Sequence, residues 1–165
     1  MESSVYDCPV PTEQQPINEY QQLKDSWLFS WGRLDLQGYI KKLGCVWMWS
    51  WLIAAPMAEA SFAPRKYPGQ FVLLGAAIAS IFVALTLLRL YLGWSYVCDR
   101  LRNVAVVYEE SGWYDVQTWT KTPEILTRDR LLVTYQVQPI RRRLLRTFGV
   151  LILCAFGGGI IWSFL

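Results

Sequence analysis

The chain has 165 residues, of which 53% are hydrophobic and none is histidine. Without an imidazole, the chain lacks the commonest general base and the commonest protein ligand of metals and haem. Its net charge is only +3, and its Lys and Arg residues lie beside apolar segments. The composition therefore argues against a nucleic-acid partner and favours a membrane protein.

Residues 1–42 are polar and precede every long apolar run, so they do not form a signal peptide. Residues 6–17 contain three prolines and predict an extended strap, because proline fixes φ and restricts the residue before it. Asn18 is the predicted N-cap of the next helix. Four large residues of that helix recur at spacings of three and four, which predicts an amphipathic helix at the membrane interface: Tyr20, Leu23, Trp27 and Trp31. The alternative is that this stripe packs onto the second loop.

Three apolar runs predict three transmembrane helices in a mainly α-helical protein. Phe71–Leu88 and Phe148–Leu165 each hold 18 residues without a charge and would form helices about 27 Å long. Leu43–Ala58 holds 16 residues and contains Pro56, so a buried or re-entrant segment is the alternative there. The predicted division is 1–42, strap and interfacial helix; 43–58, first span; 59–70, lumenal loop; 71–98, second span with its extension; 99–138, cytoplasmic insert; and 139–165, the helix that includes the third span.

Positive charge is divided unevenly between the two sides that this topology defines. The amino-terminal segment and the second loop together hold 13 Lys and Arg residues, against 2 in the first loop. The positive-inside rule therefore places the amino terminus and residues 99–146 on the cytoplasmic or stromal side. Five arginines that border the spans are predicted lipid and topology anchors: Arg89, Arg141, Arg142, Arg143 and Arg146.

The second loop predicts a β-hairpin followed by a helix. Val104, Val106 and Tyr108 share one face of the first strand, and residues 113–121 alternate again after a turn. A proline in the first turn predicts a helix over 123–137, although part of this stretch also alternates as a strand would. Pro139 is predicted to begin the helix that continues into the last span.

The second strand of the hairpin carries the predicted partner-binding surface. Trp113 and Trp119 are six residues apart and therefore share a face of a regular strand. Exposed indoles beside polar side chains are typical of binding hot spots. The alternative is that both indoles pack onto Trp27 and Trp31 as an internal core. The predicted surface consists of Trp113, Tyr114, Asp115, Gln117 and Trp119.

No catalytic, metal or cofactor site is predicted, because the four cysteines form no CxxC pair and no common catalytic or phosphate-binding motif occurs. No charged pair lies near the middle of a span, so an enzyme or transporter is not expected. A pigment carrier is the alternative, in which Trp47 and Trp51 would flank chlorophyll or haem. The axial ligand would then be water, a backbone carbonyl, Asn103 or a cysteine.

Four strings carry a resemblance to a known family: YDCPVPTEQQPINEY at 6–20, SWLFSW at 26–31, YEESGWYDVQTW at 108–119 and RDRLLVTYQVQPI at 128–140. They resemble the hypothetical chloroplast reading frame 36 family, which comprises small membrane proteins of cyanobacteria and plastids. Nuclear-encoded plant and algal members form the group named for conservation in the green lineage and diatoms. The resemblance covers nearly the whole chain and implies an oxygenic phototroph and a thylakoid membrane, but no catalytic residue.

These observations favour a non-enzymatic accessory protein that helps to assemble or stabilise a photosynthetic complex, with a pigment- or haem-binding carrier as the alternative. The expected partners are membrane lipid and a membrane protein complex of the photosynthetic apparatus. No transit peptide is recognised at the amino terminus, which favours a cyanobacterial or plastid-encoded chain.

Overall fold

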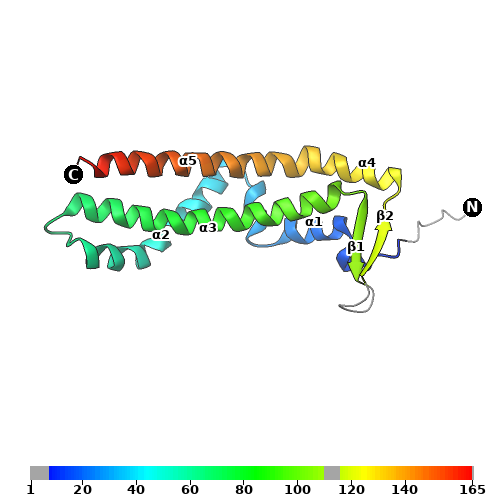
Figure 1. The fold of residues 1–165 in the computed structure, drawn as a ribbon, viewed down its shortest axis with the longest axis horizontal. Helices are drawn as coiled ribbons and strands as arrows, with labels where there is room; N and C mark the ends of the chain where they lie inside the picture. The colour runs from blue at the N-terminus through cyan, green and yellow to red at the C-terminus, as the bar shows by residue number, and fades with distance from the viewer. Residues whose placement is uncertain (1–7, 110–115, 165) are drawn as a thin grey trace, which may run out of the picture. The chain divides into compact units, whose positions relative to one another are not determined.

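The computed structural model describes residues 8–109 and 116–164 and is mainly α-helical, with one two-stranded antiparallel sheet (Figure 1). The chain divides into two compact units. The hairpin unit comprises Met1–Ser30 and Gly93–Ile140, and the helical unit comprises Trp31–Leu92 and Arg141–Leu165. The predicted helical fold with a small hairpin is therefore confirmed, whereas the three-span topology stays a prediction.

The elements follow the chain in a simple order (Figure 1). They are the 3-10 turn η1 (Thr12–Gln14), helix α1 (Pro16–Asp25), the 3-10 turn η2 (Phe29–Arg33), helices α2 (Leu36–Ser61) and α3 (Pro68–Arg102), strands β1 (Ala105–Glu109) and β2 (Val116–Thr120), helix α4 (Pro123–Leu132), the π-helical turn η3 (Val133–Val137) and helix α5 (Gln138–Trp162). Figure 1 shows the hairpin unit with α1 alongside the last part of α3 and the two strands at its end.

Helix α1 begins earlier and ends sooner than its sequence pattern predicts. Gln15 is the N-cap and Pro16 opens the helix, so Asn18 is not the N-cap. Proline suits this first position because its missing N–H would have no intrahelical partner. The helix ends at Asp25, so Trp27 lies beyond it with 75% of its surface exposed, while Trp31 is buried in the helical unit. The predicted continuous stripe is therefore wrong, because α1 ends at Asp25 and Trp31 belongs to a different unit from the other three residues.

The strap is not wholly extended. Gln14 donates its backbone N–H to Pro11 O at 2.9 Å and closes the short turn η1 within the predicted strap. Val10 is buried against the hairpin, so the strap contributes to the core of its unit. Residues 6 and 7 lie outside the described part of the chain.

The segment 123–137 is helical throughout, as favoured from the sequence. Thr122 is the N-cap and Pro123 takes the first helical position. The π-helical turn then leads directly into α5, so Pro139 lies inside a long helix and does not begin it. Pro139 has no N–H to donate, and the wider π turn before it accommodates the proline without ending the helix.

Among the described residues, two helical stretches are long and apolar enough to cross a membrane: Pro68–Arg102 and Pro123–Trp162. Helix α2 is not one of these two stretches. Its apolar run of 16 residues between Lys42 and Glu59 would be about 24 Å long, shorter than a hydrocarbon core of roughly 30 Å. The second and third predicted spans thus have suitable helices, and the first does not.

In the helical unit, α2 packs on α3 at a close approach. The ring of Trp51 contacts Gly75, where an added Cβ atom would come within 2.7 Å of Trp51 Cζ3. One face of α2 is buried through small residues, Ser50, Ala54 and Ala58. At the far end of α2, the ring of Phe62 meets Trp162 of α5 with centroids 5.4 Å apart, so α2 and α5 run in the same direction.

Candidate partner-binding surface on the hairpin

The inner face of the hairpin packs on the strap. Strand register pairs Val106 with Trp119 and Tyr108 with Gln117, and opposed residues of antiparallel strands share a face. Val106 and Tyr108 are buried with Val10, and Trp119 is partly buried against the same cluster. The predicted alternation is therefore confirmed for Val106 and Tyr108, and this face points inward. Val104 lies before β1 and is exposed, so it does not belong to this buried face.

The outer face of the hairpin is exposed along its whole described length. It consists of Ala105, Val107 and Glu109 of β1 and Val116, Thr118 and Thr120 of β2, and each of these residues is exposed. Val107 and Val116 have 54% and 58% of their surface accessible. A β-branched, mostly uncharged sheet face of this kind is the candidate partner-binding surface of this protein.

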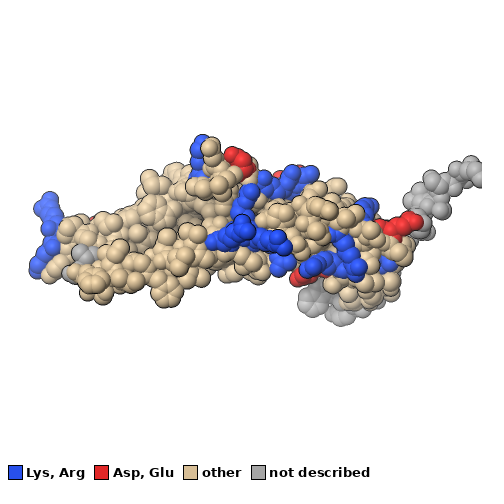
Figure 2. Space-filling model, turned by 90° about the horizontal axis from the view of Figure 1, so that it is seen from above, with Lys and Arg blue, Asp and Glu red and all other residues tan. Residues whose placement is uncertain are grey.

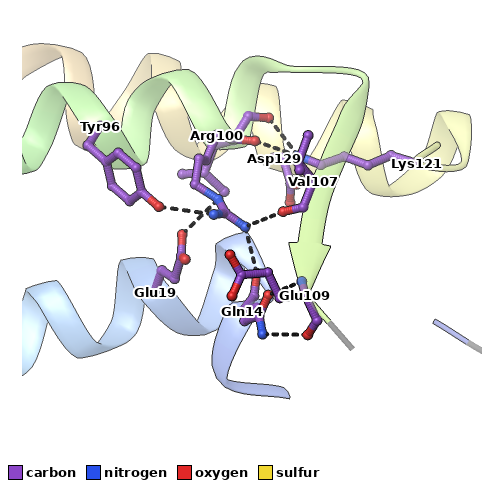
Figure 3. Close-up of polar contacts among 9 residues, drawn as sticks. Gln14, Glu19, Tyr96, Arg100, Val107, Glu109, Lys121 and Asp129 are labelled. Carbon is purple, nitrogen blue, oxygen red and sulfur yellow. Dashed lines mark hydrogen bonds and ion pairs between the residues drawn. The ribbon is translucent and has the colours of Figure 1, made fainter. Parts of the chain in front are cut away.

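The outer edge of β1 is occupied by a side-chain amide. Gln14 Nε2 donates to Glu109 O at 2.9 Å, and Glu109 N donates to Gln14 Oε1 at the same distance (Figure 3). The amide of Gln14 thus takes the place that a neighbouring strand would take. It stops further strand pairing at this point of the edge.

Arg100 of α3 holds α1, η1 and β1 together (Figure 3). Its guanidinium donates to Gln14 O at 2.9 Å and to Val107 O at 3.4 Å, and it lies 3.1 Å from Glu19 Oε2. Tyr96 Oη accepts a further bond at 3.0 Å. Burial raises the pKa of Glu19 above its usual value, while the charge of Arg100 opposes that shift. This arrangement positions the hairpin against α1 and α3.

A second polar cluster lies where β2 meets α4. Lys121 and Asp129 are almost completely buried and their charged groups are 2.8 Å apart. Lys121 Nζ also donates to the carbonyls of Arg100 and Leu101, each at 3.0 Å, at the carboxyl end of α3 (Figure 3). A cation at a helix carboxyl end satisfies carbonyls that have no intrahelical partner.

The structure describes two of the five predicted partner-binding residues, Gln117 and Trp119. Trp113, Tyr114 and Asp115 lie outside the described residues. Gln117 is exposed, and Trp119 is partly buried against the cluster of Val10, Val106 and Tyr108. Trp119 thus contributes to the core of the hairpin unit, and the partner-binding role of these residues stays a prediction.

The residues considered for a pigment belong to different units. Asn103 is exposed in the hairpin unit, whereas Trp47 and Trp51 belong to the helical unit. The two indoles contact each other edge to face, with centroids 5.6 Å apart and an interplanar angle of 76°. Because the rings already touch, a planar macrocycle would have to displace one of them.

The five predicted anchor arginines divide into two groups. Arg141 donates to Tyr91 Oη at 3.3 Å, and Arg143 donates to the carbonyls of Gly32 and Leu34. These two side chains are half-buried and hold the helical unit together. The other three, Arg89, Arg142 and Arg146, are exposed.

Sequence reasoning missed Arg100, Gln14 and the pair Lys121 and Asp129. Lys121 directly follows an exposed strand and Gln14 lies in a polar strap, so periodicity gives no reason to expect either in a hydrogen-bond network. The sequence signal for Lys121 is its position between β2 and α4, where unpaired backbone groups need partners.

Residues 8–150 match the CGLD27-like family, described as conserved in the green lineage and diatoms. The chloroplastic protein Conserved in the Green Lineage and Diatoms 27 of Arabidopsis thaliana is 45% identical over 154 residues, which cover 91% of this chain and 47% of that protein. The uncharacterised protein ycf36 of Porphyra purpurea is 41% identical over 95% of both chains. The ycf36 protein of Cyanophora paradoxa is 44% identical over 88% of this chain and 92% of its own length. No solved structure matches this chain.

Proposed function

This chain belongs to the CGLD27-like family, and on that premise we propose that it is a non-enzymatic accessory protein of the photosynthetic membrane. In this role it helps to assemble or stabilise a photosynthetic complex. The chloroplastic name of the Arabidopsis relative supports a plastid or cyanobacterial setting. The exposed outer face of the hairpin carries the proposal, because it offers a surface for a protein partner.

The proposed topology has three spans. Helices α3 and α5 supply two of them, and α2 is the third, packed on α3 through Trp51 and Gly75. An α2 shorter than the bilayer core is tolerated where flanking residues reach the interface or the bilayer thins locally. The excess of basic residues in the amino-terminal segment and the second loop supports a cytoplasmic or stromal side for the hairpin unit.

The charge of the hairpin unit indicates which kind of client surface it would fit. Met1–Ser30 and Gly93–Ile140 hold 11 of the 13 Asp and Glu residues but only 6 of the 16 Lys and Arg residues. An acidic unit repels an acidic partner and is steered toward a neutral or basic one. We therefore expect the client to present a neutral or basic surface on the same side of the membrane.

Capture of the client from photosynthetic membranes tests this function. A tagged copy purified in mild detergent should retain one photosynthetic complex in a fixed ratio. The variant Val107→Asp with Thr118→Asp places two charges on opposed, exposed positions of the outer face. Because both side chains are exposed, the variant should accumulate normally but lose roughly tenfold or more of the captured complex.

The matched control is Leu131→Asp with Thr134→Asp, which also changes one exposed aliphatic residue and one exposed threonine. This variant should capture the complex as the unchanged protein does. Equal capture of the complex by both variants would show that the outer face of the hairpin does not bind the client. A tagged protein that retains no photosynthetic complex at all would overturn the accessory function itself.

A further inference from the structure

The helical unit is strongly basic. It holds 10 of the 16 Lys and Arg residues of the chain but only 2 of the 13 Asp and Glu residues, Asp35 and Glu59. Two of its basic residues, Arg65 and Lys66, lie in the loop between α2 and α3. Most of the others lie in or beside the parts of α2, α3 and α5 that contact one another near the start of α5.

Contacts between the helices place these basic residues at one level of the helical unit. Tyr39 of α2 donates to Thr147 Oγ1 of α5 at 3.1 Å, and the guanidinium of Arg143 lies 5.8 Å from the centre of the Tyr39 ring. On the other side, the guanidinium of Arg141 lies 5.5 Å from the ring centre of Tyr91 in α3. The starts of α2 and α5 therefore lie level with residue 91 of α3.

Five basic side chains at this level are exposed and come from all three helices. They form what we name the basic collar: Lys41 and Lys42 of α2, Arg89 of α3, and Arg142 and Arg146 of α5. Arg141 and Arg143 are half-buried and engaged within the unit, and they do not belong to the collar. On the face shown in Figure 2, basic side chains gather in a band beside a broad surface without charged side chains.

Within residues 8–109 and 116–164, no carboxylate forms an ion pair with the collar. The three ion pairs of this part of the chain all lie in the hairpin unit. Asp35 accepts a bond from Gly38 N at 3.3 Å as the N-cap of α2. Glu59 lies about 27 Å further along α2 than Lys41. The charge of the collar is therefore not neutralised by an ion pair within this part of the chain.

We propose that the basic collar binds the anionic headgroups of membrane lipids. A lipid fits both parts of the surface, because Leu85 and Val150 are exposed and lie about one helical turn from Arg89 and Arg146 respectively. Guanidinium and ammonium groups on neighbouring helices would hold the phosphate, and the acyl chains would lie on the apolar face. This inference rests on the proposed membrane location, but it needs no knowledge of the client.

Quenching of tryptophan fluorescence tests the lipid proposal on the purified full chain. The protein is reconstituted into vesicles of dioleoylphosphatidylcholine that contain either brominated phosphatidylglycerol or brominated phosphatidylcholine. The phosphatidylglycerol should bind about fivefold more strongly at low ionic strength, and added salt should reduce this preference. Inorganic phosphate at millimolar concentration should not abolish it, because a free anion lacks the acyl chains.

Matched pairs of substitutions locate the site. Lys41→Gln with Arg146→Gln removes one lysine and one arginine from the collar, and Arg65→Gln with Lys66→Gln removes the same two types from the opposite loop. All four side chains are exposed, so the fold should persist. The collar pair should lose most of the preference for phosphatidylglycerol, and the loop pair should keep it.

Three results would overturn the proposal: equal binding of both lipids by the unchanged protein, equal losses in both pairs, or full displacement by inorganic phosphate. A protein that fails to integrate into the vesicles and is extracted by alkaline carbonate would instead contradict the proposed membrane function. The lipid inference and the function on which it rests therefore fail in distinguishable ways.

Discussion

Replacing Lys121 with Met is expected to lower the free energy of unfolding by about 3–5 kcal/mol. Asp129 is only 1% exposed, so the substitution leaves its carboxylate buried without its main partner. It also removes the donor that serves the carbonyls of Arg100 and Leu101 at the end of α3. Denaturant titration of the detergent-solubilised protein, followed by tryptophan fluorescence, measures this loss.

The double variant Lys121→Met with Asp129→Leu is expected to recover part of the lost stability, because no uncompensated charge remains. The two helix carbonyls still lack a donor, so recovery should be incomplete. Lys24→Met serves as the control, since Lys24 forms no ion pair within the described residues. A Lys121→Met variant as stable as the Lys24→Met control would show that the buried pair does not hold the unit together.

Replacing Trp94 with Ala is expected to cost about 3–5 kcal/mol of unfolding free energy. Trp94 is fully buried, its ring meets Tyr20 edge to face with centroids 6.2 Å apart, and its Nε1 donates to Phe29 O at 3.3 Å. The Phe29 ring lies on Gly93, so a cavity at Trp94 would loosen the connection between α1 and α3. Thermal unfolding followed by circular dichroism provides the measurement.

Trp27→Ala removes the same side chain from a position that is 75% exposed, and it should cost no more than about 1 kcal/mol. Trp94→Phe should lie between the two, because it keeps an aromatic ring but loses the indole N–H. If Trp94→Ala and Trp27→Ala unfold at the same temperature, burial of the Trp94 side chain does not stabilise the hairpin unit.

The hairpin and its following helix could be predicted from sequence because local patterns determine them. Alternation of Val106 and Tyr108 marks the inward face of β1, and Pro123 marks the start of α4. Which face of the hairpin is exposed could not be predicted. That outcome depends on Val10, which belongs to the distant strap and buries the aromatic face.

Tertiary contacts explain the remaining errors. The stripe that ends at Trp31 has the period of a helix, but α1 ends at Asp25, and Trp31 packs in the other unit beneath Lys42. A count of charges along the sequence could not identify the partners of Arg141 and Arg143 either. Arg141 donates to a tyrosine hydroxyl, and Arg143 donates to backbone carbonyls, all from distant segments. The predicted family resemblance is confirmed, because it rests on strings spread over nearly the whole chain.

Limited trypsin digestion of sealed photosynthetic vesicles, with the cytoplasmic or stromal face outward, tests the proposed membrane arrangement most directly. The exposed sites Arg102, Arg128 and Arg130 belong to the hairpin unit, whereas Arg65 and Lys66 lie in the loop assigned to the opposite side. The account predicts fragments that end at the first three residues and none that end at Arg65 or Lys66 until detergent opens the vesicles. Cleavage at Arg65 or Lys66 in sealed vesicles, with the hairpin unit protected, would contradict it.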